Sequence, residues 1–342
     1  MPHVLILRAL GLGDFLTGVP GYRALRNAHP EATLTLAAPA YLEPLLGLTG
    51  ALDLLHPTRG LGQLGSIDPP PDLAVNLHGR GPESIDQLLA TGARKLITHR
   101  HPLRVGVEGP DWTDDLHEVS RWCRLLNLEG IPTDPRDLRL RSPGITPLVS
   151  DAIVVHPGAA SSARRWPAER FGAVAQHLAD DGHPVVVTGT PDEARAAATV
   201  IGRGGLPNGA NLCGRLDLAQ LATLIAHARL VICGDTGVAH LATAYGTPSV
   251  LLFGPTPPSR WGPPDDGPHT VLWHGSTGDP HGHRADSGLL KIGVAEVVDA
   301  ARRRLSFPRA IDVRPGDQTD HGTAFGALTR VGFPPTYQEA AR

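Results

Sequence analysis

The stretch from residue 230 to residue 261 constrains the fold of this chain more than any other part of its sequence. It reads LVICGDTGVAHLATAYGTPSVLLFGPTPPSRW. Leu230–Cys233 is an apolar run with β-branched residues, which predicts a buried strand. After the polar turn GDTG, a helix is expected over Val238–Tyr245, ending at a glycine, and a second strand at Ser249–Phe253. This strand–helix–strand unit indicates an α/β fold with a parallel sheet, in which ligands bind at the carboxyl ends of the strands.

The turn inside this unit has the features of an anion site. The first amides of a helix that begins after Thr236 lack partners within the helix and point outward, which suits a phosphate group. Gly237 would let a ligand approach the backbone closely, and Asp235 would either cap the helix or bind hydroxyl groups. The same residues also make favourable turn chemistry, so a capped turn that binds nothing is the alternative interpretation.

Composition argues against several classes of function. The chain has 342 residues, enough for two domains of ordinary size, and its formal net charge of −3 gives no basic field for nucleic acid or an anionic membrane. Its cysteines, at positions 123, 213 and 233, lack the C-x-x-C spacing of a zinc site and fit a reducing compartment. The absence of a signal-peptide pattern and of an apolar stretch of roughly 20 residues predicts a cytoplasmic protein. Two histidine pairs have no further ligand pattern and are interpreted as solvated loop residues: His99 with His101, and His281 with His283.

The amino-terminal segment repeats the strand–turn–helix pattern. A strand is expected at His3–Arg8, a helix at Phe15–Ala28 with one internal proline, and a strand at 32–38. The glycines of the turn do not complete a dinucleotide-binding fingerprint, because a leucine holds the third glycine position and no acidic residue ends the second strand. Asp14 lies in the first turn of the helix. It is either a helix cap worth about 1 kcal/mol or a general base that faces a cleft.

Three strands expected in the second half end in loops of similar character. The strands at 152–156, 184–188 and 230–233 are followed by HPGAASSARRWP, TGTP and GDTG. Because the carboxyl ends of parallel strands meet at one edge of a sheet, these loops are expected to lie together. Small residues, hydroxyl groups and the adjacent Arg164 and Arg165 suit a phosphorylated ligand there, since guanidinium groups bind phosphate oxygens in a bidentate manner. The two arginines are otherwise ordinary surface charges.

Three segments, in this order, carry a family resemblance. They read ILRALGLGDFLTGVPGYRALRNAHP, VVHPGAASSARRWPAERFGAVAQHL and GDTGVAHLATAYGTPSVLLFGPTPPSRWGP, and the match extends over most of residues 3–262. Together they resemble glycosyltransferase family 9, the heptosyltransferase family. The resemblance implies a GT-B architecture, in which two Rossmann-like doubly wound domains face each other across a cleft. It implies an acceptor-binding domain over 1–148, a nucleotide-sugar-binding domain over 149–305 and a tail over 306–342.

The resemblance also implies roles for individual residues. Asp14 matches the acidic residue that is regarded as the general base of the family. Arg165 stands where the family has a Lys or Arg before Trp that contacts the donor diphosphate. The residues predicted to bind the donor are Gly13, Ser162, Arg165, Thr188, Gly189, Asp235, Thr236, Gly237 and His240. No acceptor-binding signature is recognised between residues 50 and 145.

The resemblance implies an inverting glycosyltransferase that moves a sugar to a hydroxyl of a glycan, glycolipid or small-molecule acceptor. It favours heptose from ADP-heptose as the donor, with another nucleotide-hexose as the alternative. The nucleotide sugar is a co-substrate, and neither a cofactor nor a metal ion is expected, because no D-x-D motif with clustered carboxylates is present in the candidate loops. Nucleic acid is not an expected partner, and a peripheral membrane contact is expected if the acceptor is a lipid. The alternatives are a nucleotide-sugar epimerase of GT-B shape, which needs a pair of acids in the cleft, and a non-catalytic sugar-nucleotide-binding protein, which does not need Asp14.

Overall fold

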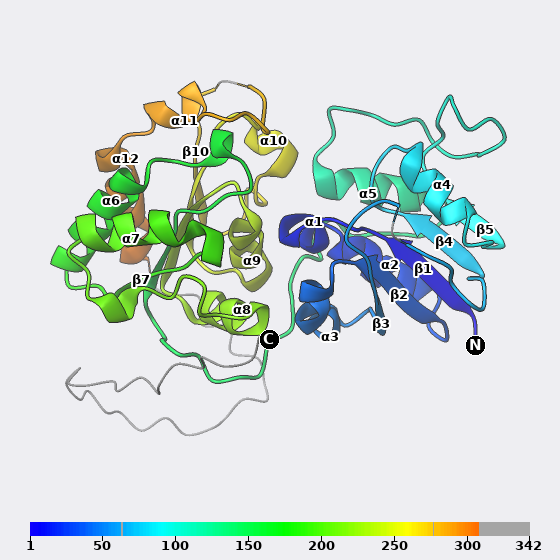
Figure 1. Ribbon diagram of the computed structural model, residues 1–342, viewed down its shortest axis with the longest axis horizontal. Coiled ribbons are helices and arrows are strands. Elements are labelled where there is room, and N and C mark those ends of the chain that lie inside the picture. The colour runs from blue at the N-terminus through cyan, green and yellow to red at the C-terminus, as the bar shows by residue number, and fades with distance from the viewer. Residues whose placement is uncertain (63, 276, 308–342) are drawn as a thin grey trace, which may run out of the picture. The chain divides into compact units, whose positions relative to one another are not determined.

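The computed structural model describes residues 1–62, 64–275 and 277–307, which form two five-stranded parallel sheets with helices packed around them (Figure 1). The first sheet has the order β3-β2-β1-β4-β5 and consists of β1 (His3–Leu7), β2 (Thr33–Ala38), β3 (Leu54–Pro57), β4 (Leu73–Asn76) and β5 (Lys95–Ile97). The second has the order β10-β9-β8-β6-β7 and consists of β6 (Ile153–His156), β7 (Val185–Val187), β8 (Leu230–Gly234), β9 (Ser249–Leu252) and β10 (His269–Leu272). The predicted α/β class is confirmed.

Helices connect the strands within each half. In the first half they are α1 (Leu12–Thr17), α2 (Val19–Ala28), the 3-10 helix η1 (Ala40–Leu45), α3 (Leu46–Thr49), α4 (Glu83–Leu89) and α5 (Glu118–Leu128). In the second half they are η2 (Ser162–Arg164), α6 (Ala168–Asp180), η3 (Pro191–Glu193), α7 (Ala194–Arg203), η4 (Asn208–Ala210), α8 (Leu218–His227), α9 (Gly237–Tyr245), α10 (Pro258–Trp261), α11 (Ser287–Lys291) and α12 (Val294–Ser306). None of the helices in the described ranges is long and apolar enough to cross a membrane.

The central strands explain why the sequence pattern was informative. All residues of β6 and β8 are buried, because each strand pairs on both edges and is covered on both faces. In the sequence, a strand that is buried on both faces is a continuous run of apolar residues. The run in β8 therefore fixes the centre of the second sheet and places its polar turn at the carboxyl edge.

The expected helix over 15–28 is wrong, because two helices occupy this segment. Gly18 separates α1 from α2, and a Cβ atom at Gly18 would lie 2.4 Å from the hydroxyl oxygen of Tyr22. The internal proline, Pro20, is in the first turn of α2, where a missing amide hydrogen costs nothing. The interpretation of Asp14 as a cap is also wrong: α1 begins at Leu12, and no side chain in the described ranges caps it.

His99 is also not a solvated loop residue. Its side chain is 1% exposed and lies edge-on against Trp112 and Trp122, with ring centroids 5.0 and 6.0 Å away. A single parallel bridge joins Val187 at the end of β7 to Asn211. Strand β10 was not expected, because its first two residues are polar.

The predicted boundary between residues 148 and 149 falls in the connection between α5 and β6, and it stays a prediction. Of the predicted tail over 306–342, the residues from 308 onward lie outside the described part of the chain.

Candidate functional site

A cavity of 1510 Å³ lies at the carboxyl ends of strands from both sheets. Pockets for a single small ligand commonly occupy about 300–1,000 Å³, so this cavity has room for more than one substrate. Segments at the carboxyl ends of β1, β2, β6, β7, β8, β9 and β10 form its wall. The wall includes Gly11–Asp14, Tyr41, Glu43, His156, Arg164, Arg165, Thr188–Glu193, Asp235–Val238, His240, Arg260 and Trp261.

The three polar loops of the second half do meet at this cavity. Their strands are neighbours in the order β8-β6-β7 and run parallel, so all three loops leave the same edge of the sheet. Every predicted site residue lines the cavity except Ser162, which begins η2 and is not part of the wall formed by the described residues. Their functional roles stay predictions, while the common location of the loops is a property of the fold.

The amino-terminal end of α9 is open toward the cavity. The helix begins at Gly237, and its N-cap residue, Thr236, has an extended backbone with φ −153° and ψ 169°. No side chain of the described residues caps this end. The amide of Ala239 donates to the carbonyl oxygen of Thr236 at 3.0 Å, so the amides before it in the helix are left for a ligand. Together with the partial positive charge of a helix amino terminus, this arrangement can hold a phosphate group.

Asp235 does not cap α9 and instead pairs with an arginine. Arg164 Nη1 lies 3.7 Å from Asp235 Oδ2 and 3.4 Å from the carbonyl oxygen of Asp235. Burial raises the pKa of Asp235, and the nearby Arg164 offsets this effect only in part. Arg165, the arginine singled out from the sequence, is exposed and donates from Nε to the carbonyl oxygen of Ala159 at 2.8 Å. Both arginines line the cavity, but only Arg164 contacts the Asp235 turn.

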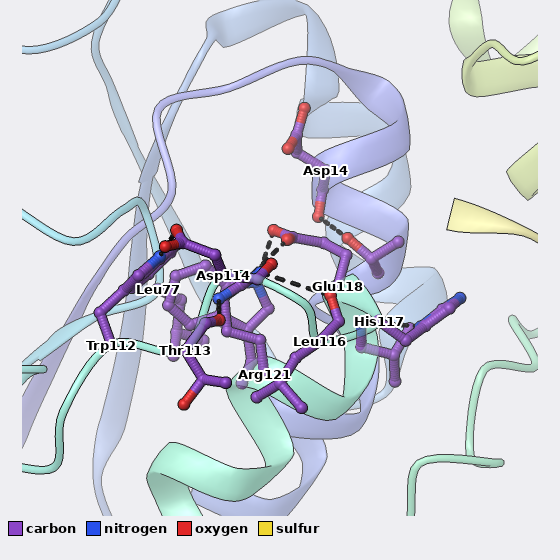
Figure 2. A network of polar contacts seen from close by, with 12 residues as sticks. Asp14, Leu77, Trp112, Thr113, Asp114, Leu116, His117, Glu118 and Arg121 are labelled. Carbon is purple, nitrogen blue, oxygen red and sulfur yellow. Dashed lines mark hydrogen bonds and ion pairs between the residues drawn. The ribbon is translucent and has the colours of Figure 1, made fainter. Parts of the chain in front are cut away.

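Asp14 supplies a carboxylate to the cavity from the first sheet. It lies in the first turn of α1, with a side chain that is 27% exposed, and its Oδ1 is 3.6 Å from Nη2 of the buried Arg8. Burial is the main effect that raises the pKa of Asp14; Glu118 adds to it, while Arg8 and Arg164 partly offset it. Figure 2 shows the Asp14 carboxylate directed away from Glu118. A partly exposed carboxylate with a raised pKa suits a general base.

Two glycines allow α1 to approach α9. A Cβ atom at Gly13 would lie 2.9 Å from His240 Cδ2, and a Cβ atom at Gly237 would lie 2.9 Å from Leu12 Cβ. Side chains at these positions would therefore force the two helices apart. Both positions therefore need glycine for α1 and α9 to pack closely. This close packing brings Asp14 and the open end of α9 to the same cavity.

His240 is a neutral imidazole at the wall of the cavity. Burial, followed by the nearby His117, lowers the pKa of His240 to about 4, and Arg164 and Arg8 act in the same direction. Its ring packs edge-on against Trp261, with centroids 5.8 Å apart. A neutral imidazole both donates and accepts hydrogen bonds, which suits contact with sugar hydroxyl groups.

The polar cavity residues of the second half that sequence reasoning missed include His156 and Glu193. His156 is buried, and its Nδ1 lies 3.0 Å from Thr188 Oγ1. Glu193 Oε2 accepts the amide of Thr190 at 2.8 Å, and a Cβ atom at Gly158 would lie only 2.0 Å from Glu193 Oε1. The T-x-x-E pattern over 190–193 is a capping-box signal that could have placed Glu193 beside the loop. In the described ranges, no group of three or more His, Cys, Asp or Glu residues is arranged to hold a metal ion.

This chain is similar to known proteins in both sequence and fold. A family model described as glycosyltransferase family 9 (heptosyltransferase) matches residues 114–283. The chain is 32% identical to lipopolysaccharide heptosyltransferase 2 of Salmonella typhimurium, with 75% of this chain and 83% of that protein covered. It is 30% identical to lipooligosaccharide heptosyltransferase 2 of Haemophilus influenzae, with 79% of this chain and 88% of that protein covered.

A solved structure gives the architecture. The structure of the Escherichia coli ADP-heptose lps heptosyltransferase II matches with a TM-score of 0.71 and 22% identity over 89% of this chain and 98% of that one. The predicted GT-B fold is thereby confirmed. From the coverage of its relatives and the family match, this chain belongs to glycosyltransferase family 9 and is a glycosyltransferase.

Proposed function

We propose that this chain is an inverting heptosyltransferase that takes heptose from ADP-heptose and attaches it to a hydroxyl of a glycan, glycolipid or small-molecule acceptor, without a metal ion. The choice of donor is supported by two relatives named heptosyltransferases and by a structural neighbour described as an ADP-heptose enzyme. The observation that carries the proposal is the shared cavity, to which one sheet contributes Asp14 and the other contributes Arg164 and the open end of α9.

The donor diphosphate fits the second half of the cavity. Its oxygens would accept from the first amides of α9, and the guanidinium groups of Arg164 and Arg165 would balance its charge. This balance is needed because the carboxylates of Asp14 and Asp235 line the same cavity and repel an anion. The sugar would then lie beside the neutral ring of His240.

The transfer is a single displacement. The acceptor oxygen forms a bond to the anomeric carbon from the face opposite the diphosphate, and the bond from that carbon to the diphosphate oxygen breaks. Asp14 takes the proton of the acceptor hydroxyl, and ADP leaves with its charge stabilised by Arg164 and the end of α9. One displacement inverts the configuration at the anomeric carbon.

A donor competition tests this proposal. Calorimetric titration of the protein with ADP-heptose, ADP-glucose, GDP-mannose and UDP-glucose should give the lowest Kd for ADP-heptose, by about tenfold or more. The product of transfer should show the opposite anomeric configuration to the donor by NMR. A UDP- or GDP-sugar that binds more tightly than ADP-heptose would refute the donor, and retained configuration would refute the single displacement.

A further inference from the structure

Arg8, a fully buried arginine next to Asp14, lies close to two carboxylates. Arg8 is 0% exposed; its Nη2 is 3.1 Å from Glu118 Oε1 but 3.6 Å from Asp14 Oδ1. Nη2 also donates to Thr17 Oγ1 at 2.8 Å, and the other nitrogens donate to the carbonyl oxygens of Asp14 and Leu77. The guanidinium is thus surrounded by acceptors, and Glu118 has the closer of the two carboxylates.

Glu118 is itself held firmly in place. It is the first residue of α5, and its Oε1 also accepts Trp122 Nε1 at 2.8 Å, while its Oε2 accepts Arg121 Nε at 3.3 Å. Figure 2 shows this carboxylate among the side chains of the polar network, whereas the Asp14 carboxylate, 3.6 Å from Arg8 Nη2, is directed away from Glu118. Glu118 is therefore a fixed counter-charge for Arg8, and the cavity side of Asp14 is left open.

If Glu118 carried no charge, the buried guanidinium of Arg8 would pair with the nearest free carboxylate, which is that of Asp14. A bidentate pair would occupy both oxygens of Asp14 and make it a weaker base. On the basis of the proposed function, we propose that Glu118 is a positioning residue: by holding and neutralising Arg8, it keeps the Asp14 carboxylate free to accept the proton of the acceptor hydroxyl.

The electrostatic surroundings of Asp14 support this role. Burial raises the pKa of Asp14, Arg8 lowers it, and Glu118 raises it again. The other charged or titratable groups that act on Asp14 or respond to it come from four further elements or turns: Tyr22 of α2, Tyr41 of η1, Arg164 of η2 and Asp235 after β8. Removal of the negative charge of Glu118 should therefore lower the pKa of Asp14 and weaken it as a base.

The test uses the full chain and three variants. Glu118→Gln removes the charge but keeps an oxygen for Trp122. Arg8→Gln combined with Glu118→Gln removes both charges, which avoids an uncompensated buried cation and so favours folding. Glu129→Gln is the matched control, because Glu129 follows the same helix and, among the residues that the structure describes, forms an ion pair only with the exposed Lys95 at 3.6 Å.

Two measurements are made on each variant: the pH profile of kcat, and the titration of the Asp14 carboxyl carbon by NMR, assigned with Asp14→Asn. In Glu118→Gln we expect the midpoint of the Asp14 titration and the acidic limb of the kcat–pH profile to move to a pH lower by about one unit. The plateau value of kcat should be lower by about tenfold. In the double variant the titration should not move down, because Arg8 no longer carries a charge. Glu129→Gln should match the wild type.

Two outcomes would overturn the inference. If Glu118→Gln lowers kcat but leaves the limb and the titration unmoved, Glu118 is only a structural carboxylate. If the double variant shows the same downward shift as Glu118→Gln, Glu118 does not act through Arg8. Because the NMR titration needs no turnover, it remains decisive if the wild type transfers no sugar, a result that would refute the proposed function alone.

Discussion

Gly13 of α1 faces His240 of α9 so closely that a Cβ atom at Gly13 would lie 2.9 Å from His240 Cδ2. The turn that carries Asp14 is thereby packed against the helix whose amino-terminal end is open to the same cavity. The distance between the proposed base and the proposed diphosphate site therefore depends on the absence of a side chain at one position.

Gly13→Ala should impair transfer through this contact. The added methyl group forces α1 and α9 apart or displaces the imidazole, and such overpacking costs about 1–3 kcal/mol. We expect a lower Tm and a fall in kcat/KM that exceeds the loss of folded protein. The control is Gly202→Ala in α7, where a Cβ atom would meet nothing within 4 Å. Equal behaviour of the two variants would show that the α1–α9 approach is not critical.

Asp14→Asn tests the general base. The variant keeps the size of the side chain but cannot take a proton, so kcat should fall by about 10²–10⁴-fold, while donor affinity changes only a few-fold. Turnover of the wild type should be lost as the pH falls through the pKa of Asp14, which burial raises above its ordinary value of about 3.9. Product assays and calorimetry at several pH values provide both results. Near-normal turnover in the variant would leave Asp14 without a catalytic role.

A further prediction concerns the stability of the Asp14→Asn variant. Because the pKa of Asp14 is raised in the folded state, folded protein binds this proton more tightly than unfolded protein does. Ionised Asp14 therefore opposes folding above its folded-state pKa, and this effect disappears below the unfolded value of about 3.9. Asp14→Asn should melt no lower than the wild type at neutral pH, and the difference should vanish in acid. A variant that melts well below the wild type at pH 7 would contradict this sign.

The sequence predicted the framework better than it predicted the contacts within the site. Continuous apolar runs revealed β6 and β8, whose residues are all buried. Among the described strands, β10 lies at the edge of its sheet and pairs only with β9. It begins with His269 and Thr270, so it shows no such run. The break between α1 and α2 was equally hidden, because the need for glycine at residue 18 comes from the hydroxyl of a side chain on the next helix turn.

The sequence could identify those site residues that are predicted by their position in a turn after a strand. Asp14 and Asp235 follow β1 and β8, and both line the cavity. Glu118 could not be found in this way, because it contacts Arg8 across 110 residues of sequence. Nor could adjacent arginines be told apart, since the direction of each side chain depends on the 3-10 turn η2.

The two arginines of η2 and its cap should have separable roles. Arg165→Ala removes a charge-assisted contact to the diphosphate worth about 1.5–3 kcal/mol, so donor affinity should weaken by about one to two powers of ten. Arg164→Ala should in addition raise the pKa of Asp14, because Arg164 lowers it, and so move the acidic limb of kcat to higher pH. Arg195→Ala, at an exposed residue of α7 outside the cavity wall, is the control. If Arg165→Ala binds the donor normally and Arg164→Ala does not, the diphosphate contact belongs to Arg164.

Metal removal tests the proposed chemistry directly. With the leaving group stabilised by Arg164, Arg165 and the end of α9, the chemical step should need no divalent ion. Transfer rates in excess EDTA should therefore equal those in Mg²⁺ or Mn²⁺. A rate that collapses with EDTA and returns with one added metal would require carboxylate ligands in the cavity and would refute this part of the mechanism.

The last prediction concerns His117, the N-cap of α5, which links the two halves. Its Nδ1 accepts the amide of Val119 at 3.2 Å, so the ring proton is on Nε2, which donates to the carbonyl oxygen of Gly262 at 3.0 Å. His117→Asn should retain the cap, because Asn is a favoured N-cap residue, but it is too short to reach Gly262. One lost hydrogen bond of about 0.5–1.5 kcal/mol should lower kcat/KM by about two- to tenfold while Tm changes little.

His117→Ala separates this effect from simple loss of the cap. It removes both contacts, so it should show the same fall in kcat/KM and an additional loss of about 1 kcal/mol in stability. Thermal melting and steady-state kinetics on the two variants provide the comparison. If His117→Asn keeps full kcat/KM while His117→Ala loses activity in proportion to stability, the contact with Gly262 does not hold Asp14 and the end of α9 in their working arrangement.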